Sequence, residues 1–455
     1  MIWLPLVLSW ILAYFIYQSS ISRLNTESGL HEYSDIQTRR YYKSNDRPQN
    51  TFYFIHISDI HVSKYAASGG IEYLKHFLSN ELRLISPELV VVTGDLTDAK
   101  SKWKLSSQQY HEEWASYYSS LQDARVLDLN HGNFWFDQRG NHDCFDVSSF
   151  DHPSNLFRHF SSQKAEGYAY ALDKSFGKYA FIGLDACPEY GSRRPFNFFG
   201  YLDGKDIEFL EKSSASMNAN HTFVLSHYPS GTLVKGSKFD AASANVSAWL
   251  SGHLHRLIGG LGDKMYANTP GRYLELELGD MKQSAMFRIM AVDHDVLSFV
   301  DLPLSINSSI VPPIVLITSP KDDRFLLSHR EPLLAEGNSH YIRFLVWAPT
   351  EISKFDIMID GESRNWTPTY SGFGSPWNIT TSSKSDYLPL WTVQWNPEEF
   401  THNRPHHLKI CAYDVSNVPG CHEVIFNNGI LIPNTDSGSG GVIISTDFNI
   451  FVFNF

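Results

Sequence analysis

Two side chains that could bind a metal ion follow an apolar stretch in the first part of the chain. Residues 52–57 read Phe-Tyr-Phe-Ile-His-Ile, and Asp59 and His61 come shortly after them. A run of aromatic and β-branched residues predicts a buried strand. Alternate residues of an extended chain share a face, so Asp59 and His61 could hold one ion between them.

Four further stretches with ligand side chains follow in order. They are Gly94-Asp95, Gly140-Asn141-His142-Asp143, Ser226-His227 and Gly252-His253-Leu254-His255. Oxygen and imidazole ligands suit Mn, Fe, Zn or Mg, and the sequence does not choose among these metals. One Asp-x-His pair is a weak signal, but five stretches in order over roughly 200 residues are specific.

The order of these stretches resembles the pattern of the calcineurin-like metallophosphoesterase superfamily, which runs D-x-H, GD, GNH(D/E), H and GHxH. Every position of that pattern is filled here. The resemblance implies two metal ions and assigns their ligands as follows: Asp59, His61 and His255 for the first, Asn141, His227 and His253 for the second, and Asp95 as the bridge. It also implies that His142 lies beside the substrate and that Asp143 orients it.

Two divalent metal ions would serve the hydrolysis of a phosphate ester, because they bind substrate oxygens and lower the pKa of a bridging water. We therefore expect a metal-dependent hydrolase acting on phosphoric ester bonds. In purple acid phosphatases a Tyr ligand follows the GD stretch, whereas this chain has Leu96-Thr97-Asp98, so the tyrosinate–iron subtype is not expected. The alternative is a non-catalytic lumenal protein that keeps the fold to bind metal or a partner; the complete ligand set and His142 favour the enzyme.

The elements that must position these residues alternate between strand and helix over residues 51–305. We expect helices at Ile71–Ile85, Trp103–Leu121 and Gly204–Lys212, and a hairpin at Tyr168–Asp185. Strands at Tyr273–Leu278 and Met286–Val300 are expected to close a second sheet. Sites at strand ends among mixed elements predict an α/β sandwich. The resemblance implies four layers, with two packed sheets flanked by helices.

Residues 313–430 carry strand patterns without helical ones. The strands are expected at residues 314–317, 341–347, 355–359, 390–395, 407–413 and 423–426. Six short strands separated by turns predict an immunoglobulin-like β-sandwich. Four cysteines allow three full pairings. Pairing within each domain would join Cys411 to Cys421 and Cys144 to Cys187, and free thiols are the alternative.

The start of the chain predicts an address in the secretory pathway. Residues 1–17 are apolar and uncharged, so residues 1–20 are interpreted as a signal peptide or a signal anchor, with a linker at 21–50. Glycosylation sequons at five positions agree with a lumenal or secreted protein: Asn220, Asn245, Asn307, Asn365 and Asn378. Membrane attachment is expected only through the N-terminal segment, and the oligomeric state stays open.

Charge limits the partners of this chain of 455 residues. Its formal net charge is −12, and no basic field would gather a nucleic acid backbone. The phosphoesterase pattern, the lumenal address and the trailing sandwich together resemble the branch that contains transmembrane protein 62 and its plant relatives. Members of that branch carry several C-terminal membrane spans, so we expect a short form with an irregular tail at residues 431–455.

Overall fold

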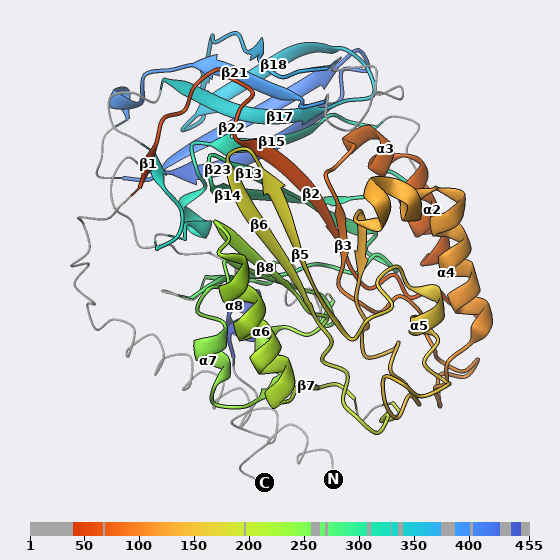
Figure 1. Cartoon of the computed structure of the whole chain (residues 1–455). Coiled ribbons are helices and arrows are strands. Elements are labelled where there is room, and N and C mark those ends of the chain that lie inside the picture. The colour runs from red at the N-terminus through yellow and green to blue at the C-terminus, as the bar shows by residue number, and fades with distance from the viewer. Residues whose placement is uncertain are drawn as a thin grey trace, which may run out of the picture.

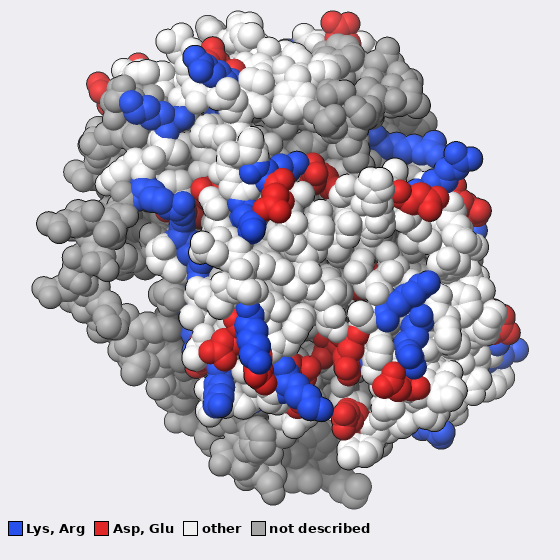
Figure 2. Space-filling view, in the orientation of Figure 1, with Lys and Arg blue, Asp and Glu red and all other residues white. Residues whose placement is uncertain are grey.

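The structure, a computed structural model, describes a large part of the chain. The described residues are 40–66, 69–194, 197–255, 264–268, 272–306, 311–327, 329–334, 340–374, 387–400, 404–427 and 438–446. Residues 1–17 and the sequons at Asn307 and Asn378 lie outside them. No helix among the described residues is long and apolar enough to cross a bilayer. Lys/Arg and Asp/Glu side chains are interspersed over the face shown in Figure 2, without a field of one sign.

Two β-sheets form the centre of the larger domain (Figure 1). The five-stranded sheet has the order β14-β13-β2-β3-β4. Its strands are β2 (Thr51–Ile57), β3 (Val90–Val92), β4 (Trp135–Asp137), β13 (Met286–Asp293) and β14 (Val296–Pro303). The six-stranded sheet has the order β11-β12-β10-β8-β6-β5. Its strands are β5 (Gly167–Lys174), β6 (Gly177–Leu184), β8 (His221–Leu225), β10 (Ala248–Ser251), β11 (Tyr266–Asn268) and β12 (Leu274–Glu277).

The two sheets pack face to face through aromatic and aliphatic side chains. Phe54 of one sheet meets Phe181 and Phe223 of the other at ring-centroid distances of 5.1 and 5.0 Å. Helices cover the outer faces, as Figure 1 shows. The five-stranded sheet is covered by α2 (Ile71–Ser79), α3 (Glu81–Ile85), α4 (His111–Asp123) and α5 (Phe157–Phe160), and the six-stranded sheet by α6 (Gly204–Met217) and α7 (Phe239–Ala242). The expected four-layer α/β/β/α sandwich is confirmed.

Three expected elements differ in detail. The helix expected at Ile71–Ile85 is two helices that meet at Asn80, and the one expected at Trp103–Leu121 begins only at His111. Residues 99–108 form a hairpin-like turn instead, closed by a bridge between Lys100 and Ser107. The strands expected to close one second sheet are divided: β12 joins the six-stranded sheet, and β13 and β14 join the five-stranded one.

The immunoglobulin-like sandwich is confirmed for the second domain (Figure 1). One sheet holds β15 (Ile314–Ser319), β17 (Tyr341–Trp347), β21 (Leu390–Gln394) and β20 (Thr369–Tyr370). The other holds β19 (Glu362–Arg364), β18 (Ile352–Ile359), β22 (His406–Asp414) and β23 (Pro419–Phe426). Cys411 and Cys421 stand opposite each other on β22 and β23 and form a disulfide.

The two domains share a continuous apolar core. Trp347 of β17 packs edge-on against Tyr53 of β2, with ring centroids 5.0 Å apart. In the lead-in to the first domain, β1 (Tyr41–Tyr42) pairs in parallel with β16 (Leu333–Leu334). Within the tail expected to be irregular, residues 438–445 form helix α8 (Gly438–Ser445), whose Ile444 is buried against Leu254.

Candidate metal centre

Loops after five strands bring all seven expected ligand residues to one edge of the sheets. Asp59 and His61 follow β2, Asp95 follows β3, Asn141 follows β4, His227 follows β8, and His253 and His255 follow β10. Strands β2, β3 and β4 run parallel, as do β8 and β10, so their carboxyl ends share an edge. Five of the seven have φ between 50° and 84°: Asp59, His61, Asp95, His253 and His255. Such left-handed backbone is costly for these residue types and gathers at functional sites.

The first cluster joins the side chains of Asp59, His61 and His255. His255 Nε2 lies 2.7 Å from Asp59 Oδ1 and 3.4 Å from His61 Nε2. His61 Nε2 lies 3.6 Å from the same Asp59 oxygen. His61 and Asp59 are buried, whereas the His255 side chain is 28% exposed. With Asp95, these residues offer two carboxylates and two imidazoles within 4.8 Å of one another, a donor set that fits a divalent cation.

The second cluster joins Asn141, His227 and His253. His227 Nε2 lies 3.0 Å from Asn141 Oδ1 and 3.2 Å from His253 Nδ1. The remaining ring nitrogens bind carbonyl oxygens at 2.8 Å, His227 Nδ1 that of Thr93 and His253 Nε2 that of Phe198. A carbonyl only accepts, so these nitrogens carry the protons and the facing nitrogens carry lone pairs. In the second cluster, therefore, the two imidazole nitrogens that face each other are unprotonated, as metal binding requires.

Asp95 lies between the two clusters. Its Oδ2 is 3.4 Å from His61 Nε2, and its Oδ1 is 3.5 Å from His227 Nε2. The two oxygens of one carboxylate thus face different ligand sets, which is the arrangement that a bridge between two ions needs. The backbone N–H of His142 donates to Oδ1 at 2.8 Å and fixes this orientation.

The charges of the site favour a cation. Burial, together with the neighbouring carboxylates Asp59 and Asp143, raises the pKa of Asp95 well above its usual value. Burial lowers the pKa of His227 to about 4, so its imidazole is neutral at physiological pH. Although burial disfavours charge on His255, Asp59 raises the pKa of this residue. Buried carboxylates in excess, beside neutral imidazoles, fit divalent cations.

Two glycines allow the loops to approach the ligands closely. A Cβ atom at Gly140 would collide with the carboxylate of Asp95, and one at Gly252 would collide with the side chains of Ser58 and Asp59. Neither glycine has positive φ. Glycine is therefore needed at both positions because the loops pass close to the ligand side chains, and not because of the backbone conformation.

His142 lies beside both clusters, but Asp143 does not orient it as expected. His142 Nδ1 binds the backbone carbonyl of Asp98 at 2.6 Å, and its Nε2 lies 3.8 Å from Asp95 Oδ2. The Asp143 carboxylate instead accepts N–H groups of Leu96, Thr97 and Gly140 at 2.9–3.0 Å. Asp143 therefore ties the loop after β3 to the loop after β4, and Asp98 holds the His142 ring.

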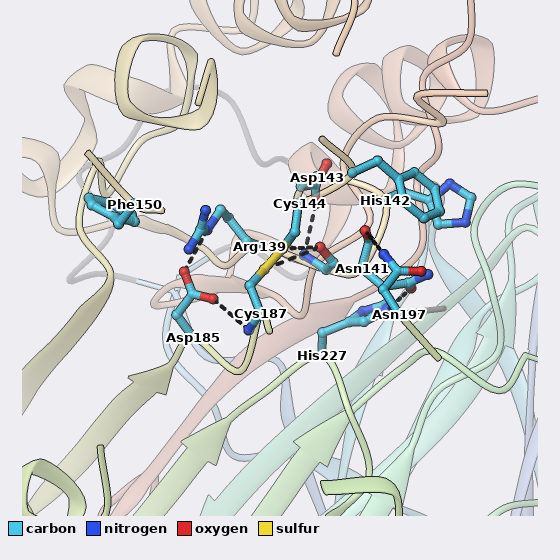
Figure 3. Close-up of a disulfide and its surroundings, with 12 residues drawn as sticks. Arg139, Asn141, His142, Asp143, Cys144, Phe150, Asp185, Cys187, Asn197 and His227 are labelled. Carbon is cyan, nitrogen blue, oxygen red and sulfur yellow. Dashed lines mark hydrogen bonds and ion pairs between the residues drawn. A yellow bond between two sulfur atoms is a disulfide. The ribbon is translucent and has the colours of Figure 1, made fainter. Parts of the chain in front are cut away.

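A disulfide anchors the loop that carries Asn141 and His142 (Figure 3). Cys144, two residues after His142, is bonded to Cys187, which follows β6. Beside it, Arg139 Nε pairs with Asp185 Oδ2 at 2.6 Å, with both side chains buried. These links fix the Asn141 loop to the end of the six-stranded sheet.

Sequence reasoning missed three side chains that support the site. The Asp98 carboxylate lies 3.3 Å from His61 Nδ1 and accepts from Lys282 Nζ at 2.6 Å. Asn197 donates to the backbone oxygen of Asn141 at 2.7 Å (Figure 3). The position of Asp98, three residues after Asp95, is a usable signal for this role. Nothing in the sequence connects Lys282 or Asn197 with the site.

The described sequons differ in their surroundings. Asn245 and Asn365 are exposed. Asn220 is half-buried, and its side-chain amide donates to Asp295 at 2.8 Å and accepts from the N–H of Lys178 at 3.3 Å. A glycan at Asn220 would break the first of these bonds, so this position is a poor acceptor.

Both domains resemble known families. Residues 52–257 match the calcineurin-like phosphoesterase family, and residues 310–427 match the TMEM62 Ig-like domain. Transmembrane protein 62 of Mus musculus is 34% identical over 368 residues, which cover 80% of this chain and 53% of that protein. "Putative metallophosphoesterase" of Arabidopsis thaliana is 28% identical over 324 residues, which cover 61% of this chain and 43% of that protein. The chain thus spans about half the length of these relatives.

Among solved structures, a purple acid phosphatase from yellow lupin (Lupinus luteus) seeds is 13% identical with a TM-score of 0.36. The alignment covers 59% of this chain and 54% of that one.

Proposed function

We propose that the chain, which is similar to transmembrane protein 62 and matches the calcineurin-like phosphoesterase and TMEM62 Ig-like families, hydrolyses phosphate esters at a binuclear metal centre. Asp59, His61 and His255 hold the first ion in this proposal. Asn141, His227 and His253 hold the second, and Asp95 bridges them. The observation that carries the proposal is the position of the Asp95 carboxylate, whose two oxygens face His61 and His227 at 3.4 and 3.5 Å.

The two ions would supply Lewis acidity and a hydroxide nucleophile at neutral pH. The chain's own contribution beyond the ligands is His142. Because the Asp98 carbonyl can only accept, His142 Nδ1 carries a proton, and Nε2 is the atom that faces the reacting groups. Burial lowers the pKa of His142 well below its usual value, so the resting imidazole is neutral and Nε2 carries a lone pair. Nε2 can therefore accept the proton that the attacking water loses and pass it to the leaving oxygen, while the Asp98 carbonyl holds the ring at the angle that these transfers require.

A metal-dependent assay tests the proposal. Purified protein loaded with Mn²⁺ is expected to hydrolyse p-nitrophenyl phosphate or its bis ester. The variant H142A is expected to retain both metals, measured by elemental analysis, and to lose about 100-fold or more in kcat. The exposed His131 provides the matched control, because H131A should leave rate and metal content unchanged. Hydrolysis of neither ester by the metal-loaded protein would support the non-catalytic alternative, and loss of metal in H142A would contradict the role given to this residue.

We also infer a lumenal or extracellular address. The apolar residues 1–17, the exposed sequons at Asn245 and Asn365, and two disulfides support it, since disulfides persist in oxidising compartments. Glycosidase treatment of the protein made in a eukaryotic secretory host is the test. N245Q and N365Q should each remove one mobility shift, and N220Q should remove none. An unglycosylated product would contradict the address.

A further inference from the structure

Large apolar side chains are exposed on two loops beside the metal centre. Of the twelve large apolar side chains that the described residues expose, five lie on these loops: Trp103 (77%), Leu105 (87%), Tyr190 (86%), Phe198 (46%) and Phe199 (36%). Exposed apolar residues scattered singly need no explanation, whereas a group of them marks an interaction site. Trp103, Leu105 and Tyr190 are the three most exposed of the twelve.

The first loop is the hairpin-like turn of residues 99–108. It is closed by backbone hydrogen bonds from Ser101 to Ser106 at 2.9 Å and from Gln108 to Ala99 at 3.0 Å. Its base is Asp98, whose carbonyl holds His142, and its tip is Lys102-Trp103-Lys104-Leu105. The turn therefore projects from the edge of the candidate metal centre, with both apolar side chains at its far end.

The second loop, residues 187–194 and 197–199, runs from the first loop to the second metal cluster. Arg194 Nη1 donates to the Lys104 carbonyl at 3.2 Å, and the Phe198 carbonyl accepts from His253 Nε2 at 2.8 Å. The Phe198 ring lies 4.8 Å from the ring of His253. The two loops are thus joined to each other and lie beside the candidate metal centre. We call their exposed apolar and basic side chains the rim.

The rim is basic in a chain that is acidic overall. The turn carries the exposed Lys102 and Lys104 and no acidic residue, while its Lys100 pairs with Asp98 at 3.3 Å. The second loop adds Arg194, and Arg193, which pairs with Asp146, against one acid, Glu189. The formal net charge of the whole chain is −12. Lys102 and Lys104 flank Trp103, and the Lys102 ammonium lies 5.6 Å from the Trp103 ring. Basic residues alternating with a Trp and an aliphatic residue suit the boundary between lipid headgroups and acyl chains.

We propose that the rim docks on an anionic lipid bilayer, with Trp103 and Leu105 at the headgroup level and Lys102 and Lys104 against anionic headgroups. The candidate metal centre, which both loops contact, then lies next to the phosphates of the headgroup layer. The substrates are accordingly phosphate esters of membrane lipids, and this second statement rests on the proposed function. We favour an anionic bilayer as the partner of the rim for two reasons. The apolar side chains of the rim protrude from the surface, and the charge around them is positive.

A position-specific fluorescent label tests the docking in the full chain. All four cysteines are disulfide-bonded, so an introduced cysteine is the one reactive thiol. L105C, labelled with an environment-sensitive dye, keeps Trp103. In V415C the same dye sits at a residue that is also exposed (69%) but lies in the turn between β22 and β23. Because both proteins keep residues 1–17, any insertion of that apolar segment is the same in the two.

The expected result is a blue shift at position 105 with phosphatidylserine-containing vesicles, and quenching by brominated acyl chains, with neither at position 415. Replacing Lys102 and Lys104 by Gln should lower the apparent affinity for these vesicles about thirtyfold at low salt. Equal responses at positions 105 and 415, or none at either, would overturn the proposal. A response at position 105 with uncharged phosphatidylcholine vesicles that equals the response with anionic ones would overturn its electrostatic part.

A second measurement separates docking from catalysis. The double variant W103S/L105S should lower hydrolysis of a phosphate ester presented in anionic vesicles about tenfold while leaving hydrolysis of p-nitrophenyl phosphate unchanged. V415S is the matched control and should leave both rates unchanged. If neither ester is hydrolysed, the proposed function fails while the label still reports on docking. If W103S/L105S lowers both rates equally, or neither, the rim does not select lipid substrates.

Discussion

Asp95 is the residue on which the metal centre depends most. Its carboxylate is buried between the two ligand clusters, and its position is fixed by the N–H of His142 and by contact with Gly140. Other ligands serve one cluster each, whereas Asp95 faces both. Removing its charge should therefore affect both ions, and removing His255 should affect one.

The variant D95N keeps the size of the side chain and removes the negative charge. We expect the metal content, measured by elemental analysis, to fall from two ions to less than one per chain, and kcat with Mn²⁺ to fall about 100-fold or more. H255A is the matched comparison and should lose one ion while the second cluster keeps its own. If D95N retained both ions with near-normal affinity, Asp95 would not be the bridge.

At the scale of elements, helices hold the loops beside the candidate metal centre in place, and helix α4 is an example. Glu113 in its first turn accepts the backbone N–H groups of Ala99 and Lys64 at 2.9 and 3.1 Å. Ala99 begins the turn at 99–108, and Lys64 lies in the loop after β2. Burial raises the pKa of Glu113 from 4.5 to about 7. One carboxyl group on a helix thus holds two loops that border the metal centre.

The pH dependence of stability should report this group. Because the folded-state pKa is raised, the contribution of Glu113 is fully present below about pH 4.5 and is lost as pH rises to about 7. The free energy of unfolding of the parent chain should fall by about 3 kcal/mol between these limits. In E113Q this fall should be absent, as measured by urea titration at each pH. Glu211 is exposed on helix α6, so E211Q should leave the pH profile unchanged. Identical profiles for E113Q and the parent chain would contradict the burial of a charged group here.

Other features of the elements show what the sequence could and could not predict. The buried strand ahead of Asp59, the hairpin of β5 and β6 and the strands of the second domain were predicted because their apolar runs are short and bounded by turns. The start of α4 was misplaced because Trp103 is in helical register with Tyr110 and Trp114, although it lies exposed in a turn. The role of Asp98 was missed because a carboxylate on a loop is ordinarily solvated. Lys282 meets Asp98 only through long-range folding, across 184 positions.

At the scale of the whole molecule, the two domains form one unit through a buried ion pair. Arg343 of β17 is fully buried, with Nε 2.8 Å from Asp293 Oδ2 and Nη2 3.0 Å from Asp293 Oδ1. Its Nη1 donates to the carbonyls of Asn45 and Arg47 at 2.7 and 2.9 Å. Although burial disfavours charge on Asp293, Arg343 holds the pKa of that carboxyl below its usual range. One guanidinium therefore joins the sandwich, the end of β13 and the lead-in segment.

Breaking this pair should separate the domains. R343M leaves Asp293 buried without the guanidinium. We expect the free energy of unfolding to fall by about 3–5 kcal/mol. We also expect two calorimetric transitions, where one is expected for the parent chain. Asp293 would then have a raised rather than a lowered pKa, so the damage should grow as pH rises from 4 toward 7. Adding D293L should restore part of the stability, because two apolar groups leave no unpaired charge.

R404Q is the control, since Arg404 pairs with Asp360 at the surface with 65% of its side chain exposed, and it should cost less than about 1 kcal/mol. An R343M chain that still unfolds in one transition at the parent temperature would show that the apolar contact of Trp347 with Tyr53 suffices to couple the domains.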